Sequence, residues 1–200
     1  MISDHSPRQA VRAEIETLSV ALADAFQDDP VFGWLMPSPA RRRLRLVRFF
    51  KLELRHVVLP TGRVWTTDGA TGASLELPPE AWKLPIGTQL AHGPAFTRVF
   101  GARLPLAMAL ITLMEHRHLR ERHIYVPYIG VASRAQGQGL GTALLQPTLD
   151  RCDREGLPAY LEATSERNVA LYERLGFRHL GAFHLGNSPP LWQMRRPPAQ

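Results

Sequence analysis

Cysteine is nearly absent from this sequence of 200 residues, in which Cys152 is the only one. A single cysteine allows neither an intramolecular disulfide nor a cysteine-based metal cluster. Cys152 falls within a helical pattern, which favours a buried apolar side chain over a nucleophile. We therefore expect no metal site.

Long apolar runs and a leader segment are also missing. No uninterrupted run of about 18 apolar residues occurs, which predicts that no segment spans a membrane. Residues 1–16 lack the apolar centre and the small-residue cleavage site of a signal peptide. Together these absences predict a cytoplasmic protein that does not contact a membrane.

Acidic residues are outnumbered by basic ones, 18 against 24, and the net charge is +6. Such a balance can indicate nucleic-acid binding, but here most basic residues are scattered along the chain. The one dense run, at 41–48, mixes arginine with Leu and Val and is followed by Phe49 and Phe50. This mixture is typical of an amphipathic helix with a solvated basic face, and an anion-binding face is the alternative. We expect a small-molecule partner and no nucleic acid.

Apolar periodicity and turn residues predict a mixed α/β fold in one domain over residues 1–200. We expect helices at 9–26, 31–36, 40–59, 137–155 and 168–175, and strands at 63–67, 70–77, 124–131, 159–163, 177–185 and 191–195. Residues 80–122 are repeatedly interrupted by proline and glycine. That segment predicts two or three short helices, the last near 104–119.

Three glycines at alternate positions, Gly137, Gly139 and Gly141, lie between the apolar strand 124–131 and the helix that follows. Glycine permits unusual backbone conformations and lets a ligand approach the main chain closely. The N–H groups of such a turn, together with the unpaired N–H groups of the next helix, form a site for phosphate or pyrophosphate.

Two common nucleotide-binding motifs do not fit this segment. A Walker P-loop needs a lysine after its last glycine, and none follows here. A dinucleotide-binding fingerprint needs Gly-x-Gly-x-x-Gly, whereas these glycines are spaced by two throughout. A glycine-rich loop without a ligand is the remaining alternative.

The residues around the glycines resemble the GNAT superfamily of N-acetyltransferases. Gln136-x-x-Gly139-x-Gly141 matches the Gln/Arg-x-x-Gly-x-Gly/Ala signature of that family, and an Asn168-x-x-x-Tyr172-x-x-x-Gly176-Phe177 frame follows at the expected distance. The similarity covers residues 124–185. Within the superfamily the chain is most similar to puromycin N-acetyltransferase and its bacterial relatives, on the segments 156–164 and 25–30.

The resemblance implies a single-domain GNAT fold, in which a mixed, mostly antiparallel twisted sheet is flanked by helices. Two splayed central strands would hold the coenzyme A arm. Residues 1–122 would supply the N-terminal helices, a hairpin and a substrate-side segment, and residues 123–196 would form the acetyl-CoA-binding half.

The function implied is direct transfer of an acetyl group, in a ternary complex, from acetyl-CoA as co-substrate to a primary amine of a small molecule. The protein would be a monomer or a homodimer, and no metal would take part. A protein lysine or N-terminal acetyltransferase and a non-catalytic acyl-CoA-binding module are the alternatives.

The resemblance also assigns cofactor-binding residues. These are Ile129, Gly130, Val131, Gln136, Gly137, Gln138, Gly139, Leu140, Gly141, Thr142 and Asn168. The backbone N–H of Ile129 would face the thioester oxygen, where negative charge develops during transfer. Asn168 would bind the pantetheine arm, and capping its own helix is an equally plausible role.

Two residues are candidates for catalysis. Tyr172 is the candidate general acid for the departing thiolate, and a structural aromatic ring on a short helix is the alternative. Glu162 is the candidate base for the amine, because an unpaired carboxylate in an apolar strand is costly unless it serves a cation. An ion pair with a core arginine is its alternative role. Glu76, His123 or ordered water could act as the base in its place.

Overall fold

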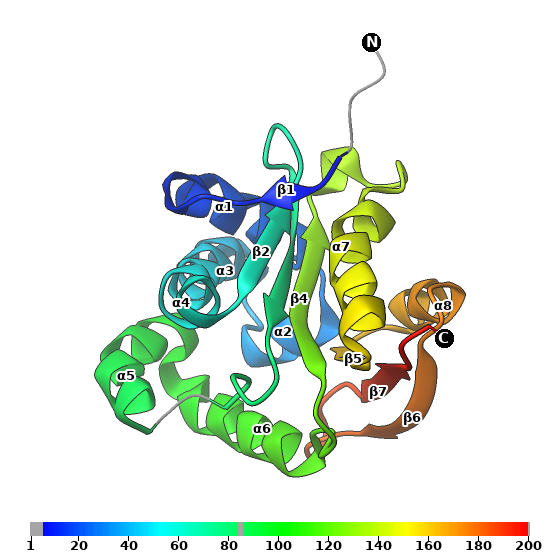
Figure 1. Ribbon diagram of the computed structural model, residues 1–200. Coiled ribbons are helices and arrows are strands. Elements are labelled where there is room, and N and C mark those ends of the chain that lie inside the picture. The colour runs from blue at the N-terminus through cyan, green and yellow to red at the C-terminus, as the bar shows by residue number, and fades with distance from the viewer. Residues whose placement is uncertain (1–5, 84–85, 200) are drawn as a thin grey trace.

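A seven-stranded sheet runs through the centre of the computed structural model, which describes residues 6–83 and 86–199 (Figure 1). The order of strands across the sheet is β1-β2-β3-β4-β5-β7-β6. Their bounds are β1 Arg8–Gln9, β2 Arg63–Thr66, β3 Gly72–Leu77, β4 Ile124–Val131, β5 Ala159–Ala163, β6 Arg178–Phe183 and β7 Leu191–Arg196. Neighbouring strands are antiparallel except for β4 and β5, which are parallel. The predicted mixed, mostly antiparallel sheet is confirmed.

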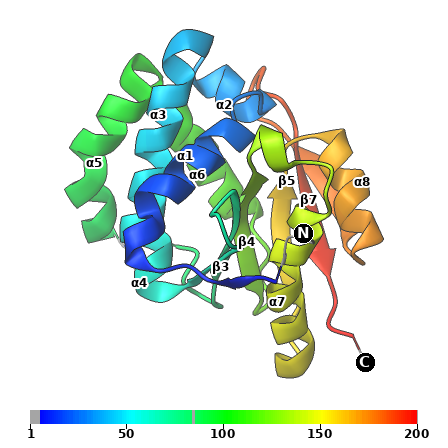
Figure 2. The ribbon, with the colours of Figure 1, turned by 90° about the horizontal axis from the view of Figure 1, so that it is seen from above.

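Helices cover both faces of this sheet. The first group comprises α1 Ile15–Ala25, α2 Pro30–Leu35, α3 Pro39–Leu52, α4 Leu59–Thr61, α5 Ile86–Phe100 and α6 Leu104–Arg117. The second group comprises α7 Leu140–Glu155 and α8 Glu166–Arg174. Seen from above, α1, α3, α5 and α6 lie on one side of the sheet, and α7 and α8 lie on the other (Figure 2).

Each face of the sheet has its own apolar core. One core joins α1, α2 and α3 to β2 and β3, and the other joins α7 and α8 to β4 and β5. In α3 the side chains of Leu46, Phe49 and Phe50 are buried, while most of the arginines of the 41–48 run face solvent. The predicted amphipathic helix is thereby confirmed. Cys152 is buried in the second core, as expected, and burial raises the pKa of its thiol to about 12.

The long helix expected at 40–59 is interrupted by a π-helical segment, η2, at Glu53–Val58. A wider turn of this kind changes which side chains face inward. Glu53, at its start, is turned into the protein and is only 8% exposed. A periodicity of 3.6 residues could not have predicted this burial.

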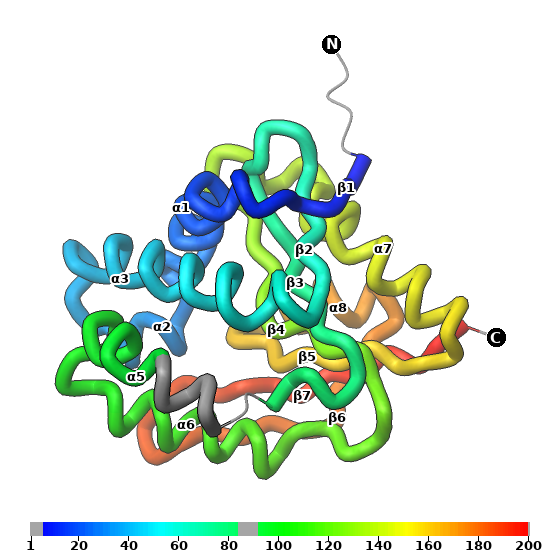
Figure 3. The backbone as a smooth tube through the Cα atoms, turned by 60° about the vertical axis from the view of Figure 1, so that its left-hand side comes forward, coloured from blue at the N-terminus to red at the C-terminus, as the bar shows by residue number. Residues whose placement is uncertain are grey.

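The segment expected to hold two or three short helices forms two long ones, α5 and α6, which Figure 3 follows from α3 to the start of β4. Pro94 lies inside α5, against the expectation that proline would end the helix. The stretch His92–Arg117 is 26 residues long and, by length and composition alone, is apolar enough to cross a membrane. It is broken at Gly101, whose φ is +58°, by the 3₁₀ turn η3 Gly101–Arg103.

A bulge and a splay shape the middle of the sheet. Leu75 lies opposite Tyr128 and Leu77 lies opposite Tyr125, so β4 carries one extra residue there. Pro127, which has no N–H group to donate, lies within this bulge. Beyond the bulge, β4 and β5 separate, because only Ile124 and Tyr125 of β4 pair with β5. This is the gap that the family resemblance predicts.

Candidate active site

The larger of two adjoining cavities, about 660 Å³, opens between the end of β4, the glycine-rich loop, the start of α2 and the start of α8. Its wall is mostly backbone on the glycine side. Arg167 and Arg174 of α8 also line it and bring positive charge. A cavity with free N–H groups on one side and guanidinium groups on another is suited to an anionic, phosphate-bearing ligand.

The glycine-rich loop owes its shape to two left-handed residues. Gly137 and Gly139 both have a φ of +77°, and Gly139 is the N-cap of α7. A Cβ atom at Gly137, Gly139 or Gly141 would meet no other atom within 4 Å. Packing therefore does not demand glycine here; backbone conformation demands it at the first two positions, and the open space in front of all three is the cavity.

The hydrogen bonding of β4 shows which backbone groups face the gap. Ala132 donates its N–H to the carbonyl of Thr71 at 2.8 Å. Bonded and non-bonded pairs alternate along an antiparallel ladder, so Gly130 turns its N–H toward β3. Ile129 and Val131 consequently point their N–H groups the other way, toward the gap beside β5. The side-chain amide of Gln136 donates to the carbonyl of Val131 at 2.9 Å, on that same side.

Gly130 has a packing reason to be glycine. A Cβ atom there would lie 2.9 Å from Cβ of Ala25 and 2.9 Å from the ring of Phe26. These distances are too short, so any side chain would push α1 away from β4. Gly130 therefore allows the close approach that brings the end of α1 to the rim of the larger cavity.

The smaller cavity, about 160 Å³, lies deeper, between β4, β5 and the helical layer of α2, α3, α5 and α6. Five phenylalanines line it: Phe26, Phe32, Phe49, Phe96 and Phe100. The ring of Tyr128 packs edge-on against Phe26, Phe49 and Phe50, with centroids 5.4–6.0 Å apart. Three carboxylates, those of Asp29, Glu53 and Glu162, interrupt this aromatic lining.

Burial and the three carboxylates shift pKa values in this cavity. Burial raises the pKa of Glu53 to about 7, and no hydrogen bond or ion pair of its side chain occurs within the described part of the chain. The pKa of the Tyr128 hydroxyl is raised well above its usual value by burial first, and then by the charges of Glu53, Glu162 and Asp29. The smaller cavity is thus aromatic and acidic at once, which suits an organic cation.

The two cavities meet at a shared wall. Five residues line both of them: Phe26, Asp29, Ile129, Asn168 and Tyr172. The candidate general acid, the backbone N–H proposed for the thioester oxygen and the candidate arm-binding asparagine all belong to this junction. A reaction between ligands in the two cavities would take place here.

Tyr172 is buried at this junction, with 6% of its surface exposed. Its ring packs against Phe177 with centroids 5.7 Å apart. Burial, and after it the charge of Asp29, raises the pKa of its hydroxyl. The hydroxyl is therefore protonated at neutral pH, as a proton donor must be. Tyr172 thus belongs both to the core, as its structural alternative requires, and to the cavity wall.

Asn168 does not cap α8, so that alternative role is wrong. Ser165 is the N-cap, and its hydroxyl accepts from the N–H of Asn168 at 3.3 Å. Asn168 is the third residue of the helix, which leaves its side chain free to line both cavities.

Glu162 lies on the floor of the smaller cavity, and its side chain is 2% exposed. Its Oε2 accepts from the Tyr125 hydroxyl at 2.8 Å. Its Oε1 has no hydrogen bond and lies 3.4 Å from Nδ1 of His118. Within the described residues no arginine pairs with it, so the alternative of a core arginine ion pair is wrong. One buried oxygen is left with capacity to bind a substrate N–H group.

The alternative bases lie elsewhere. Glu76 is fully buried on the α7 face of the sheet, paired with Arg151 and accepting from the Thr148 hydroxyl at 2.8 Å and from Nε1 of Trp65 at 3.1 Å. It lines neither of the two adjoining cavities, so its role is structural. His123 also lines neither of them, and it contacts Glu162 only through His118.

Asp29 is the residue that sequence analysis passed over at the junction. Its Oδ1 caps α2 by accepting from the N–H groups of Val31 at 3.0 Å and Phe32 at 2.9 Å, while Oδ2 accepts from the Thr164 hydroxyl. Burial raises the pKa of this carboxyl. The Asp-Pro pair was a visible capping signal, but its place beside Tyr172 depends on packing between distant elements.

Comparison with known proteins agrees with this architecture. A profile of the Acetyltransferase (GNAT) family matches residues 101–177. A solved structure from Corynebacterium glutamicum, named as histone acetyltransferase HPA2 and related acetyltransferase, has a TM-score of 0.75 and 27% identity, and the match covers 98% of this chain and 97% of that one. The chain has the GNAT fold, and its residues 101–177 are similar to the GNAT acetyltransferases.

Two further relatives differ in how much of them the chain covers. An uncharacterised N-acetyltransferase of Schizosaccharomyces pombe is 29% identical over 181 residues, which is 84% of this chain and 72% of that protein. A mycothiol acetyltransferase of Acidothermus cellulolyticus is 36% identical over 111 residues, which is 51% of this chain. The matched part is only 33% of that enzyme's length.

In this chain the larger cavity is lined by nearly all the residues predicted to bind the cofactor. Ten of the eleven line it, and Gln138 is the exception. Their individual roles stay predictions. Arg167, Arg174 and Asp29 were not predicted as lining residues. Among the described residues, no group of three or more His, Cys, Asp and Glu side chains could hold a metal ion.

Proposed function

We propose that the larger cavity binds acetyl-CoA, that the smaller cavity binds a primary amine, and that the acetyl group passes between them at the junction. The shared lining of the two cavities by Ile129, Asn168 and Tyr172 carries this proposal. The match of residues 101–177 to the GNAT family profile and the name of the S. pombe relative, an N-acetyltransferase, support it.

Four groups divide the chemistry. The N–H groups of the glycine loop and the start of α7 bind the pyrophosphate, and Arg167 and Arg174 add positive charge. The N–H of Ile129 stabilises the thioester oxygen as the amine nitrogen attacks the carbonyl carbon. A C–N bond forms, the C–S bond breaks, and Tyr172 donates a proton to the departing thiolate. The nitrogen loses one proton as the neutral amide forms, and that proton restores the Tyr172 hydroxyl.

Glu162 binds the ammonium form of the amine and accepts its proton. An alkylamine with a pKa near 10 is only about 0.1% neutral at pH 7, so an enzyme must bind the ammonium ion and then remove its proton. Glu162 lines the smaller cavity and its Oε1, which lies 3.4 Å from Nδ1 of His118, accepts no hydrogen bond, so the carboxylate can do both. The hydroxyl of Tyr125 donates to Oε2 and therefore leaves Oε1 available.

The lining of the smaller cavity indicates the class of amine. Its volume of about 160 Å³ and its phenylalanine walls suit a compact primary amine with an apolar or aromatic body. Helices α5 and α6 help to enclose this cavity through Phe96, Phe100 and Leu110, which favours a small molecule over a peptide threaded across the site. The similarity to puromycin N-acetyltransferase belongs to this proposal and makes puromycin one of the amines to test.

Cofactor binding is the first test. Isothermal calorimetry should detect acetyl-CoA binding to the wild type, and Gly139→Val should abolish it, because the side chain would occupy the space in front of the loop. Gly186→Val is the matched control. Gly186 also has a positive φ, +56°, with no atom within 4 Å of its Cβ, but it lies in the turn after β6 and lines neither cavity. Equal loss in both variants, or no binding by the wild type at millimolar concentration, would refute the assignment.

A further inference from the structure

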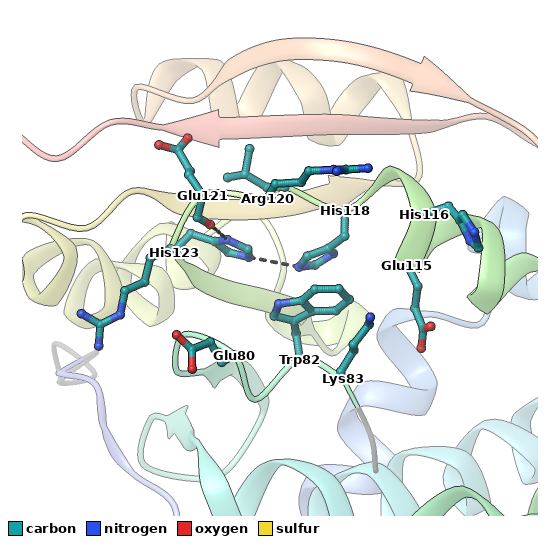
Figure 4. Close-up of a pocket in the computed structure, with 11 residues that line it drawn as sticks. Glu80, Trp82, Lys83, Glu115, His116, His118, Arg120, Glu121 and His123 are labelled. Atoms are coloured by element: carbon teal, nitrogen blue, oxygen red, sulfur yellow. Dashed lines mark hydrogen bonds between the residues drawn. The ribbon is translucent and has the colours of Figure 1, made fainter. Parts of the chain in front are cut away.

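The side chains of Glu162, His118 and His123 form a row that leads away from the smaller cavity. Oε1 of Glu162 lies 3.4 Å from Nδ1 of His118, and Nε2 of His118 lies 3.0 Å from Nε2 of His123. Nδ1 of His123 lies 2.7 Å from the carbonyl oxygen of Glu121. Glu162 comes from β5. The two histidines come from the end of α6 and from the turn before β4, and Figure 4 shows them facing each other.

The two ends of this row face different cavities. Glu162 lines the small amine cavity, while His118 and His123 line a separate open cavity of about 490 Å³. Both histidines have little exposed surface, 6% and 2%. The row therefore crosses the wall between the buried site and a space that water can fill.

The hydrogen bonds fix where the protons lie. A carbonyl oxygen only accepts, so Nδ1 of His123 carries a proton and, in the neutral ring, Nε2 is an acceptor. His118 must then donate its Nε2–H to His123. Nδ1 of a neutral His118 is thus a lone pair facing Oε1 of Glu162. Nδ1 of His118 and Oε1 of Glu162 can form a hydrogen bond only when one of the two atoms carries a proton.

The ring of Trp82 packs against the ring of His118. The indole ring stacks on the imidazole with centroids 3.8 Å apart and planes 24° apart, as Figure 4 shows. An aromatic face attracts a cation placed above it, so Trp82 is a compatible neighbour for a ring that carries a proton. The same tryptophan covers the row on the side of the open cavity.

We propose that His118 and His123 relay the proton of the amine from Glu162 to water in the open cavity; this rests on the function proposed above. The ammonium proton passes to Oε1 of Glu162 and on to Nδ1 of His118. His118 gives its Nε2 proton to Nε2 of His123, and His123 releases one proton to water. Each group ends with the number of protons it started with, and the amine has lost one. His118 ends with its proton on Nδ1, so the proton must return to Nε2 before the next turnover.

Other titratable groups around the row set the background of any pH profile. Tyr125 and Tyr160 lie edge-on to His118 at 4.7 and 4.8 Å. Glu121 is paired with Arg195, and Lys83 lies 5.4 Å from the ring of Trp82. Burial lowers the pKa of His123, which keeps its acceptor nitrogen free at neutral pH.

The relay is tested by His123→Asn. Asparagine keeps an amide N–H for the carbonyl of Glu121 but removes the Nε2 acceptor. We expect kcat at pH 7 to fall by about tenfold to a hundredfold, with KM for the amine unchanged and with recovery of the rate as pH rises. Imidazole added to the solution should restore part of the rate, because the open cavity has room for it. The control is His116→Gln, which alters the same cavity outside the row and should behave as wild type.

A second variant guards against failure to fold. His118→Gln can bond to His123 but cannot carry a proton, and it should show the same pH-dependent loss. A wild-type pH–rate profile in either folded variant would overturn the relay. A loss that is equal at every pH and unrescued by imidazole would also overturn it. Absence of amine acetylation by the wild type would instead refute the proposed function.

Discussion

Glu53 supplies a quantitative prediction about stability. Its carboxyl group is buried beside Tyr128 at the start of the π-helical segment, and burial alone raises its pKa from 4.5 to about 7. Below pH 4.5 the folded and unfolded chains both hold the proton. Between pH 4.5 and 7 the unfolded chain releases it first, so the free energy of unfolding falls as pH rises. Above pH 7 the penalty is constant.

The size of this penalty follows from the two pKa values. Each pH unit between them is worth about 1.4 kcal/mol, so the full penalty is about 3 kcal/mol. Glu53→Gln cannot ionise and should lose this pH dependence. Urea unfolding at pH 5 and pH 8 measures this dependence. From pH 5 to pH 8 the wild type should lose about 2–3 kcal/mol more unfolding free energy than the variant does.

Glu173→Gln is the control for this measurement, because Glu173 is an exposed carboxylate on α8. That variant should keep the pH dependence of the wild type. If Glu53→Gln and the wild type lose stability equally between pH 5 and pH 8, the carboxyl of Glu53 is not buried as described, and the acidic lining of the amine cavity would have to be revised.

Two further predictions concern the reacting groups. Tyr172→Phe should keep the affinity for acetyl-CoA and lower kcat by about 10²–10⁴, because only the proton donor is lost; unchanged turnover in steady-state kinetics would make Tyr172 a structural residue. Glu162→Gln should lower kcat by about a hundredfold, with partial recovery toward the pKa of the amine. Glu76→Gln is its control: it should leave kcat intact and reduce stability by about 1–3 kcal/mol, since Arg151 keeps only Glu155 as a charged partner and Arg63 also loses the Glu76 carboxylate. If Glu76→Gln lowered kcat and Glu162→Gln lowered only stability, Glu76 would be the base and Glu162 the structural carboxylate.

The cofactor half of the fold could be predicted because its signals are local. The apolar strand β4, the glycines and the helix α7 follow one another along the chain, and their turn chemistry can be recognised within a window of about twenty residues. The left-handed φ of Gly137 and Gly139 is a direct consequence of that chemistry. The expected positions of Asn168 and Tyr172 followed from the family frame.

The amine side could not be predicted in the same way, because long-range packing creates it. Glu162 meets His118 across 44 positions of sequence, and Asp29 meets Thr164 across 135. The inward turn of Glu53 depends on a π-helical segment that no periodicity announces. Glu76 was an alternative to Glu162 in the sequence, and only the structure pairs it with Arg151, 75 residues away.

Amine-dependent release of coenzyme A tests the central claim most directly. Free thiol would be measured with acetyl-CoA and a panel of compact aliphatic and aromatic primary amines, puromycin and a lysine peptide, and the acetylated product identified by mass spectrometry. We predict release that requires a small amine, exceeds the peptide rate and disappears in Gly139→Val. Release that is independent of every amine, or acetylation of the peptide alone, would contradict the account.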